Sequence, residues 1–280
     1  MTVRAARDPA VAPRGVAHAR AAAGMSGFLA ITALLFAAGV AATAYGCMAM
    51  ADMPAMAMPG GWRMDMTWMR MPGQGAMAAN ASFAAMWIAM MLAMMLPAVA
   101  PPLWRYRAAV AARGDVRGGG LCAVAGLAYF AVWSVPGVLI HPLGGAVATV
   151  LMRSPALARA APATAAIVIA LAGLVQFSAW KRHRLACCRA REIPPPYRRA
   201  DAATAWRYGS RLGLHCLGGC AGFTAALLVV GVMDWRAMLL ATVAIAAERL
   251  LPDGERVAKV SGAALIALGL WQLPGAVAGG

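Results

Sequence analysis

The feature that most constrains this chain is a series of long apolar stretches separated by short segments rich in arginine. A helix needs about 20 predominantly apolar residues to cross a bilayer, and only a helix or a closed barrel satisfies the backbone polar groups there. We expect seven spans, at residues 26–46, 78–100, 119–141, 163–180, 212–233, 237–251 and 260–274. The sequence therefore predicts an all-α, polytopic bundle of transmembrane helices. The last two stretches are short enough to form one tight hairpin, which would leave six full spans.

The composition supports a membrane protein and excludes a nucleic-acid-binding one. Apolar residues make up 62% of the chain, charged residues only 12%, and the mean hydropathy is +0.68. Soluble domains carry about 25% charged residues. A net charge of +15 could suggest a nucleic acid partner. The arginines lie in short segments between apolar stretches, however, and no basic motif interleaved with aromatic residues is present. The positive charge therefore indicates how the spans are oriented in the membrane.

Arginine asymmetry predicts the orientation of the spans. The head, residues 1–25, is basic and broken by proline, so we expect it to be disordered and cytoplasmic. The basic segments after the second and fourth spans then also lie inside, whereas residues 47–77 and the tail, residues 275–280, lie outside. The core, residues 78–274, is predicted to be a multi-pass protein of the bacterial inner membrane. A cleaved signal peptide is the alternative for residues 26–46, but that stretch is long for a signal, which favours an uncleaved anchor.

Methionine is concentrated in the outer segment and in the second span, and fifteen of the twenty methionines lie between residues 48 and 95. Thioether sulfur is a soft, neutral ligand that selects Cu(I) over zinc, magnesium or calcium. Nine outer methionines are therefore candidate ligands: Met48, Met50, Met53, Met56, Met58, Met64, Met66, Met69 and Met71. The alternative is that they act as adaptable apolar packing. Their spacing by one or two residues in one wet loop favours metal capture.

The second span continues this pattern. Met86, Met90 and Met94 recur every four residues, so they form one stripe along a helix, and Met91 and Met95 lie on the neighbouring face. At about 1.5 Å per residue the stripe extends for about 12 Å. Continuity with the outer methionines favours a path for the metal, whereas ordinary packing or lipid-facing methionine is the alternative.

Cysteine and histidine are predicted to form a second soft-metal site at the inner side. Cys216 and Cys220 are four residues apart, so both thiols point to one side of a helix. We expect basic neighbours to lower the pKa of the thiols and favour thiolate. The candidate ligands are Cys187, Cys188, His215, Cys216 and Cys220, and the basic neighbours are Lys181, Arg182, Arg184, Arg189 and Arg211. Zinc-ribbon spacing is absent, so Zn(II) fits less well than Cu(I). Small buried cysteines that only pack are the alternative.

Three polar residues are candidates to support this site. Glu248 is the only acid within a predicted span, and ionisable residues there are functional candidates by default. It could equally extend to the interface or pair locally with Arg249. His183 and Gln176 lie close to the predicted cysteines in the sequence and join the candidate set.

Five short motifs carry a resemblance to a known family. They are M-W-I-A-M-M-L-A-M-M-L-P at 86–97, Q-F-S-A-W-K-R at 176–182, G-L-H-C-L-G-G-C at 213–220, G-V-M at 231–233 and E-R-L-L-P at 248–252. The chain resembles a bacterial family of predicted metal-binding integral membrane proteins, domain of unknown function 2182. The resemblance covers the second to seventh spans and implies metal binding without naming the metal. Two positions differ from the family pattern: Gly219 and Arg184 stand where the family often has cysteine.

Together these patterns predict a protein that captures Cu(I) at the outer loop and passes it along the methionine stripe to an inner Cys/His site. Its partners would be the lipid bilayer, the metal ion and a periplasmic or cytoplasmic metallochaperone. Phosphate-loop and pump phosphorylation motifs are absent, so nothing identifies an energy source, and a non-enzymatic role is favoured. Two alternatives remain open. One is a membrane thiol–disulfide oxidoreductase, and the other is a non-transporting scaffold that helps to metallate a partner.

Overall fold

The protein is a bundle of α-helices in the computed structural model, which describes residues 14–51, 55–70, 73–113, 117–190 and 200–278. The helices are α1 (Arg14–Ala51), α2 (Ala76–Ala111), α3 (Gly118–Arg153), α4 (Pro155–Val175), α5 (Ala179–Arg189), α6 (Ala202–Val230), α7 (Trp235–Leu250) and α8 (Gly254–Ala278). Between α1 and α2 lie a two-stranded antiparallel hairpin, β1 (Met56–Ala57) and β2 (Arg63–Met64), and a 3₁₀ turn, η1 (Met66–Trp68).

Six of these helices are long and apolar enough to cross a membrane: α1, α2, α3, α4, α6 and α8. The sixth predicted span is the shorter helix α7, whose 16 residues extend for about 24 Å against an apolar thickness of about 30 Å. The prediction of an all-α, polytopic bundle is confirmed.

Several helix boundaries differ from those that apolar length predicts. Helix α1 begins at Arg14, within the segment predicted to be disordered, and it continues to Ala51, so Met48 and Met50 lie on a helix rather than in a loop. The fourth span was predicted to reach Trp180, but α4 ends at Val175. The chain breaks because Ser178 caps a new helix, α5, by accepting a hydrogen bond from the Lys181 backbone N–H at 3.1 Å.

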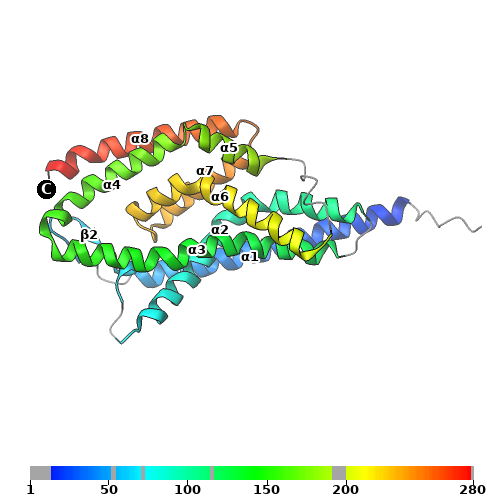
Figure 1. The fold of residues 1–280 in the computed structure, drawn as a ribbon, viewed down its shortest axis with the longest axis horizontal. Helices are drawn as coiled ribbons and strands as arrows, with labels where there is room; N and C mark the ends of the chain where they lie inside the picture. Colours follow the sequence, from blue (N-terminus) through cyan, green and yellow to red (C-terminus); the bar gives the residue numbers. More distant parts are fainter. Residues whose placement is uncertain (1–13, 52–54, 71–72, 114–116, 191–199, 279–280) are drawn as a thin grey trace, which may run out of the picture.

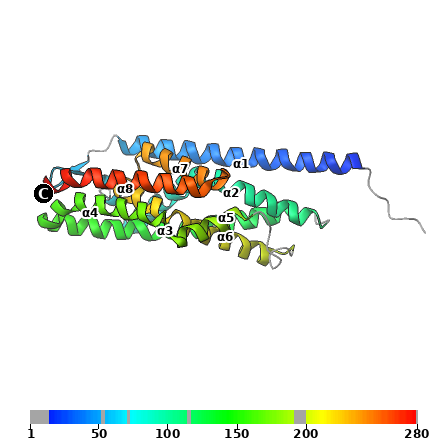
Figure 2. The ribbon, with the colours of Figure 1, turned by 90° about the horizontal axis from the view of Figure 1, so that it is seen from above.

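The helices run along one common direction, with the N-terminal end of α1 and the C-terminus at opposite ends of the molecule (Figures 1 and 2). Helix α4 packs along α8, and α3 packs along both α2 and α6. Small residues permit these close approaches, as in other membrane bundles. A side chain at Gly209 of α6 would overlap the backbone of Ala125 in α3, and one at Gly173 of α4 would overlap that of Gly262 in α8.

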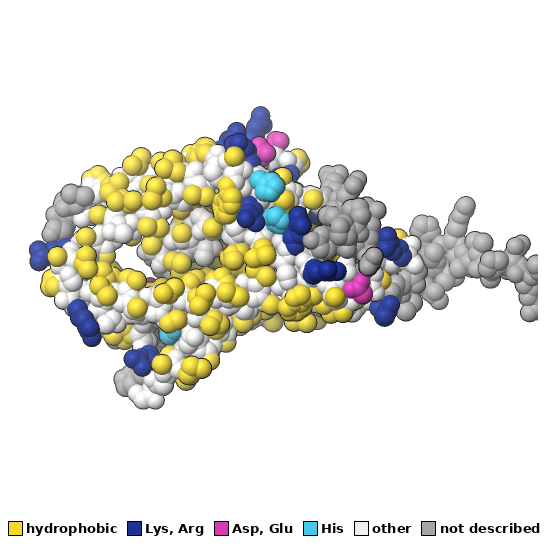
Figure 3. Space-filling view, in the orientation of Figure 1, with side chains coloured by type: hydrophobic (Ala, Val, Ile, Leu, Met, Phe, Trp, Pro, Cys, Tyr) yellow, Lys and Arg dark blue, Asp and Glu magenta, His cyan; other side chains and the backbone are white. Residues whose placement is uncertain are grey.

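Helix α2 is the most buried of the long apolar helices and α1 the least. Apolar side chains cover the middle of the molecule, and Lys and Arg gather toward its two ends, with a concentration around α5 (Figure 3). This distribution matches a bilayer around the apolar middle. Helix α2 packs along α1 and α3, and some of its buried side chains share a cavity with residues of α6 and α7.

Candidate metal centre

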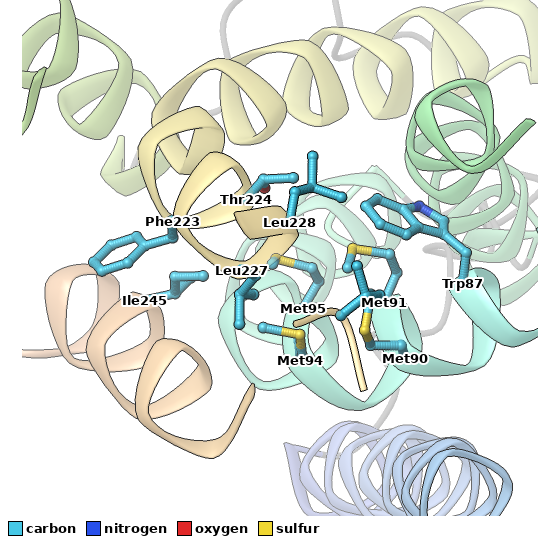
Figure 4. Close-up of a pocket in the computed structure, with 11 residues that line it drawn as sticks. Trp87, Met90, Met91, Met94, Met95, Phe223, Thr224, Leu227, Leu228 and Ile245 are labelled. Carbon is cyan, nitrogen blue, oxygen red and sulfur yellow. The ribbon is translucent and has the colours of Figure 1, made fainter. Parts of the chain in front are cut away.

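Four methionines of α2 line a small internal cavity with a volume of about 10 Å³. Met90, Met91, Met94 and Met95 are each at most 3% exposed, and they project from α2 toward α6 (Figure 4). Trp87 and side chains of α6 and α7, including Phe223 and Ile245, complete the wall. The two neighbouring faces of this helix, one with Met90 and Met94 and the other with Met91 and Met95, therefore line the same cavity. Met86 is only partly buried, packs against the edge of the same apolar cluster and does not line the cavity.

One methionine of the cavity, Met95, contacts the first of two cysteines of α6. The Sγ of Cys216 lies 3.8 Å from the Sδ of Met95, and Cys216 and Cys220 interact through their thiols, as expected for residues four apart on a helix. Both cysteines are almost completely buried. We call Met95, Cys216 and Cys220 the sulfur cluster. Its three sulfur atoms come from two helices and form a soft donor set of the kind that suits Cu(I).

Hydrogen-bond donors surround this cluster. The hydroxyl of Tyr129 lies 2.7 Å from the Sγ of Cys216, and Nη2 of Arg249 donates to the Sγ of Cys220 at 3.3 Å. Trp133 also approaches Cys216, and its buried Nε1 has no hydrogen-bond partner among the described residues. Donors aimed at sulfur stabilise negative charge there, which is the state in which a thiol binds a metal.

Cys188 of α5 is buried near the same cluster, but its electrostatics differ from the sequence-based expectation. Burial raises the pKa of the Cys188 thiol to about 11, and the nearby charges of Arg249 and Lys181 only partly oppose this effect. The expectation that basic neighbours lower the thiol pKa is therefore wrong for Cys188, because desolvation outweighs them.

The structure separates the remaining predicted inner ligands from the sulfur cluster. Neighbouring residues on a helix point about 100° apart, so Cys187 and Cys188 face different ways, as do His215 and Cys216. Cys187 lies on the exposed face of α5, with its Sγ 3.7 Å from Nε2 of His183. The rings of His183 and His215 are 6.3 Å apart. Nη1 of Arg184 lies 3.4 Å from Nδ1 of His215. Within the described ranges, no three His, Cys, Asp or Glu side chains converge on one point.

A buried ion pair links α5, α6 and α7 beside the cluster. Nζ of Lys181 lies 2.6 Å from Oε2 of Glu248 and donates to the carbonyl oxygen of Gly219 at 2.7 Å. Ser261 of α8 donates to the other carboxylate oxygen at 3.2 Å. Glu248 is therefore buried and paired with Lys181, and it neither reaches the interface nor pairs with its neighbour Arg249. Gln176 is also buried, lines a second cavity with Lys181, and its amide has no partner among the described residues.

The outer methionines divide into packed, half-buried and exposed groups. Met58 and Met64 are buried in a small apolar cluster against α3 and α4, together with Trp62 and Trp68. The indole N–H of Trp62 fixes this cluster by donating to the carbonyl oxygen of Ala158 at 2.8 Å.

The other outer methionines that the structure describes are less buried, and Met48 is 63% exposed. Met50, Met56, Met66 and Met69 are half-buried. Met53 and Met71 lie outside the described residues. Met56 lies opposite Met64 in the hairpin.

The helices that carry the sulfur cluster also carry a family match. A family model described as PpoB2, copper chaperone, matches residues 84–272, which is most of the chain. The chain belongs to the PpoB2 copper chaperone family. None of the curated proteins and none of the solved structures matches it. The family model does not carry the family name that the sequence motifs suggested, but its description as a copper chaperone agrees with the metal binding that this resemblance implies.

The PpoB2 match covers the methionine cavity and the sulfur cluster and leaves the outer methionine segment outside it. Copper is therefore the metal that the candidate site must suit, and the soft donor set does so. Sequence reasoning missed Tyr129, Trp133 and Arg249 as neighbours of the sulfur atoms. Only Arg249 could have been noticed in the sequence, because it is a basic residue near the end of a predicted span. It was considered there only as a partner of Glu248.

Proposed function

We propose that this member of the PpoB2 family carries Cu(I) from its outer end, along the methionine cavity of α2, to the buried sulfur cluster. The observation that supports this most directly is the 3.8 Å approach of Met95 to Cys216, which joins the methionine cavity to the thiols. Copper is the cargo in this proposal, and the Cu(I) state follows from the ligands, because thioethers and thiols prefer the soft monovalent ion.

The order of the ligands gives the path a direction. Methionine binds Cu(I) through a neutral sulfur, whereas cysteine binds it as a thiolate and gains charge attraction as well. An ion that enters among Met90, Met91 and Met94 would therefore be held more strongly once it reaches Cys216 and Cys220. Movement toward the cysteines is favourable without an external energy source, and release from them needs an acceptor, which fits a soluble metallochaperone or another copper-requiring partner.

The proposed location is the bacterial inner membrane, with the outer methionine segment outside the cytoplasm. The basic segments around α5 and after α2 support this orientation, since cytoplasmic loops carry an excess of Lys and Arg. Topology reporters fused after Gly75 and after Arg113 should report opposite sides of the membrane. Signals from the same side would contradict the proposed orientation.

Cu(I) stoichiometry of the detergent-purified protein tests the proposed site. Replacing both Cys216 and Cys220 by serine exchanges soft ligands for hard ones of similar size, so bound Cu(I) should fall while the protein still purifies. Cys122→Ser is the matched control, because Cys122 is also buried but donates to the carbonyl oxygen of Leu103, away from the cluster. Full stoichiometry in the double variant, together with easier unfolding, would mean that these cysteines only pack.

A second candidate function is a non-transporting scaffold that loads copper into a partner protein, which the family description as a copper chaperone favours. Proteoliposomes with a Cu(I) chelator sealed inside separate the two, because only a transporter delivers copper to the trapped chelator. A thiol–disulfide oxidoreductase is less well supported, since Cys216 and Cys220 are buried and exchange requires access for the attacking thiolate.

A further inference from the structure

We propose that Arg249 is a fixed counter-charge that makes the sulfur cluster specific for a monovalent soft cation held between two thiolates. This inference rests on the proposed function for the position of the copper, and it goes further by naming the charge of the ion and the residue that selects it.

Arg249 lies in the last turn of α7. Its Nη2 donates to the Sγ of Cys220 at 3.3 Å, and its charge acts on Cys216, Cys188 and Tyr129 as well. A guanidinium stays protonated in proteins, so this positive charge is permanent. Arg249 therefore directs a fixed cation at the two thiols that would bind the metal.

The carboxylate that neighbours Arg249 in the chain is already paired with another residue. Glu248 precedes Arg249 in the chain, but its carboxylate binds Nζ of Lys181 at 2.6 Å inside the bundle. A further ion pair joins Arg256 to Asp253 at the surface. Since Lys181 and Glu248 cancel, the cluster with neutral thiols keeps one net positive charge, which is unfavourable in a poorly solvated interior.

The charge of the bound metal decides whether the charge of Arg249 is balanced. When a monovalent cation binds, two thiols release two protons and form a complex M(SR)₂ with one negative charge, which cancels the charge of Arg249. A divalent cation with two thiolates is neutral and leaves Arg249 uncompensated. A third thiolate would restore the balance for a divalent ion, but no three Cys, His, Asp or Glu side chains converge within the described part of the chain. The thioether of Met95 adds a neutral ligand and leaves the count unchanged.

The consequence is selection by charge in addition to softness. Cu(I) and Ag(I) satisfy both conditions, whereas Zn(II) accepts thiolate ligands but leaves an uncompensated charge beside Cys220. Removing the charge of Arg249 should therefore weaken monovalent binding and improve the relative binding of Zn(II). A purely structural arginine would affect all metals alike.

The experiment compares Arg249→Gln, which removes the charge, with Arg249→Lys, which keeps it, using competition titrations of Cu(I), Ag(I) and Zn(II) on the purified protein. Arg249→Gln should lower Cu(I) affinity at least about tenfold, the range found for residues that support metal ligands, and raise the ratio of Zn(II) to Cu(I) affinity. Arg249→Lys should retain most of the Cu(I) affinity. Arg256→Gln is the control, since Arg256 is exposed on the following helix.

A double variant separates charge balance from general damage. With Cys220→Ser only one thiolate remains, so the complex with Cu(I) is neutral, and removing the charge of Arg249 should then cost less Cu(I) affinity than in the wild type. Equal losses in both backgrounds, or an unchanged metal preference in Arg249→Gln, would overturn the inference. If Arg249→Gln does not fold, wild-type protein that binds Zn(II) as tightly as Ag(I) would overturn it too, and a clear preference for Ag(I) would support it. The proposed function fails separately, if wild-type Cu(I) binding is unaffected by loss of Cys216 and Cys220.

Discussion

Replacing Met95 with leucine should block copper transfer while leaving the fold nearly intact. Met95 is 1% exposed, and leucine matches it in volume and apolarity, so the change should cost less than about 1.5 kcal/mol of unfolding free energy. It removes the sulfur that lies 3.8 Å from the Sγ of Cys216. The next methionine on that face, Met91, is one turn away, about 6 Å further along the helix, so no thioether remains in contact with the first thiol.

The loss of one of three ligands should reduce Cu(I) affinity at the cluster at least about tenfold, or about 1.4 kcal/mol. Proteoliposomes with a trapped Cu(I) chelator measure transfer, and thermal unfolding in detergent measures stability. Met238→Leu is the matched control, because Met238 is 6% exposed in the same apolar cluster but does not line the methionine cavity. If the Met95 variant transfers copper as fast as the wild type and the control, the methionines of α2 are packing and the proposed path is wrong.

Three further predictions concern the framework around the site. Lys181→Met leaves the carboxylate of Glu248 buried and unpaired, so it should cost about 3–5 kcal/mol in denaturant titrations, and Lys181→Met with Glu248→Leu should recover most of that loss. Gly209→Ala should destabilise the bundle by about 1–3 kcal/mol, because the new methyl overlaps the backbone of α3, whereas Gly120→Ala enters open space and should be neutral. Burial raises the pKa of the Cys188 thiol from 9.0 to about 11, so the unfolded chain loses this proton at a lower pH than the folded protein does. The free energy of unfolding of the metal-free protein should therefore fall between about pH 9 and pH 11, and it should fall less steeply in Cys188→Ala.

The sequence predicted the parts of the fold that depend on length and on local spacing. Apolar length identified the six long spans, and a spacing of four residues brought Cys216 and Cys220 together, because both are properties of a single helix. The short helix α5 was missed, since its start depends on a capping hydrogen bond that the Lys181 backbone N–H donates to Ser178, inside a stretch that still looked apolar. Local spacing also identified the methionine stripe, and its position against a cavity emerged only with the fold.

Contacts between helices could not be predicted in the same way. The sequence grouped Cys187 with Cys188 and His215 with Cys216, but which residue of each pair faces inward depends on how α5 and α6 are rotated in the bundle. The same reason explains why Tyr129 and Arg249 were missed, since they reach the thiols from α3 and α7. Sequence spacing also cannot distinguish ligand methionines from packing ones in the outer segment, where the burial of Met58 and Met64 favours packing.

The charges of the ligands along the proposed path determine where copper should be held. A Cu(I) ion among neutral thioethers keeps its full positive charge in an apolar cavity, so no site there should hold it for long. At the inner end the thiols of Cys216 and Cys220 can become negative, and Arg249 balances the complex that results. A passage of weak ligands that ends at a charge-balanced site favours movement toward that site and retention there. We therefore expect copper to rest at the sulfur cluster and only to pass through the methionine cavity.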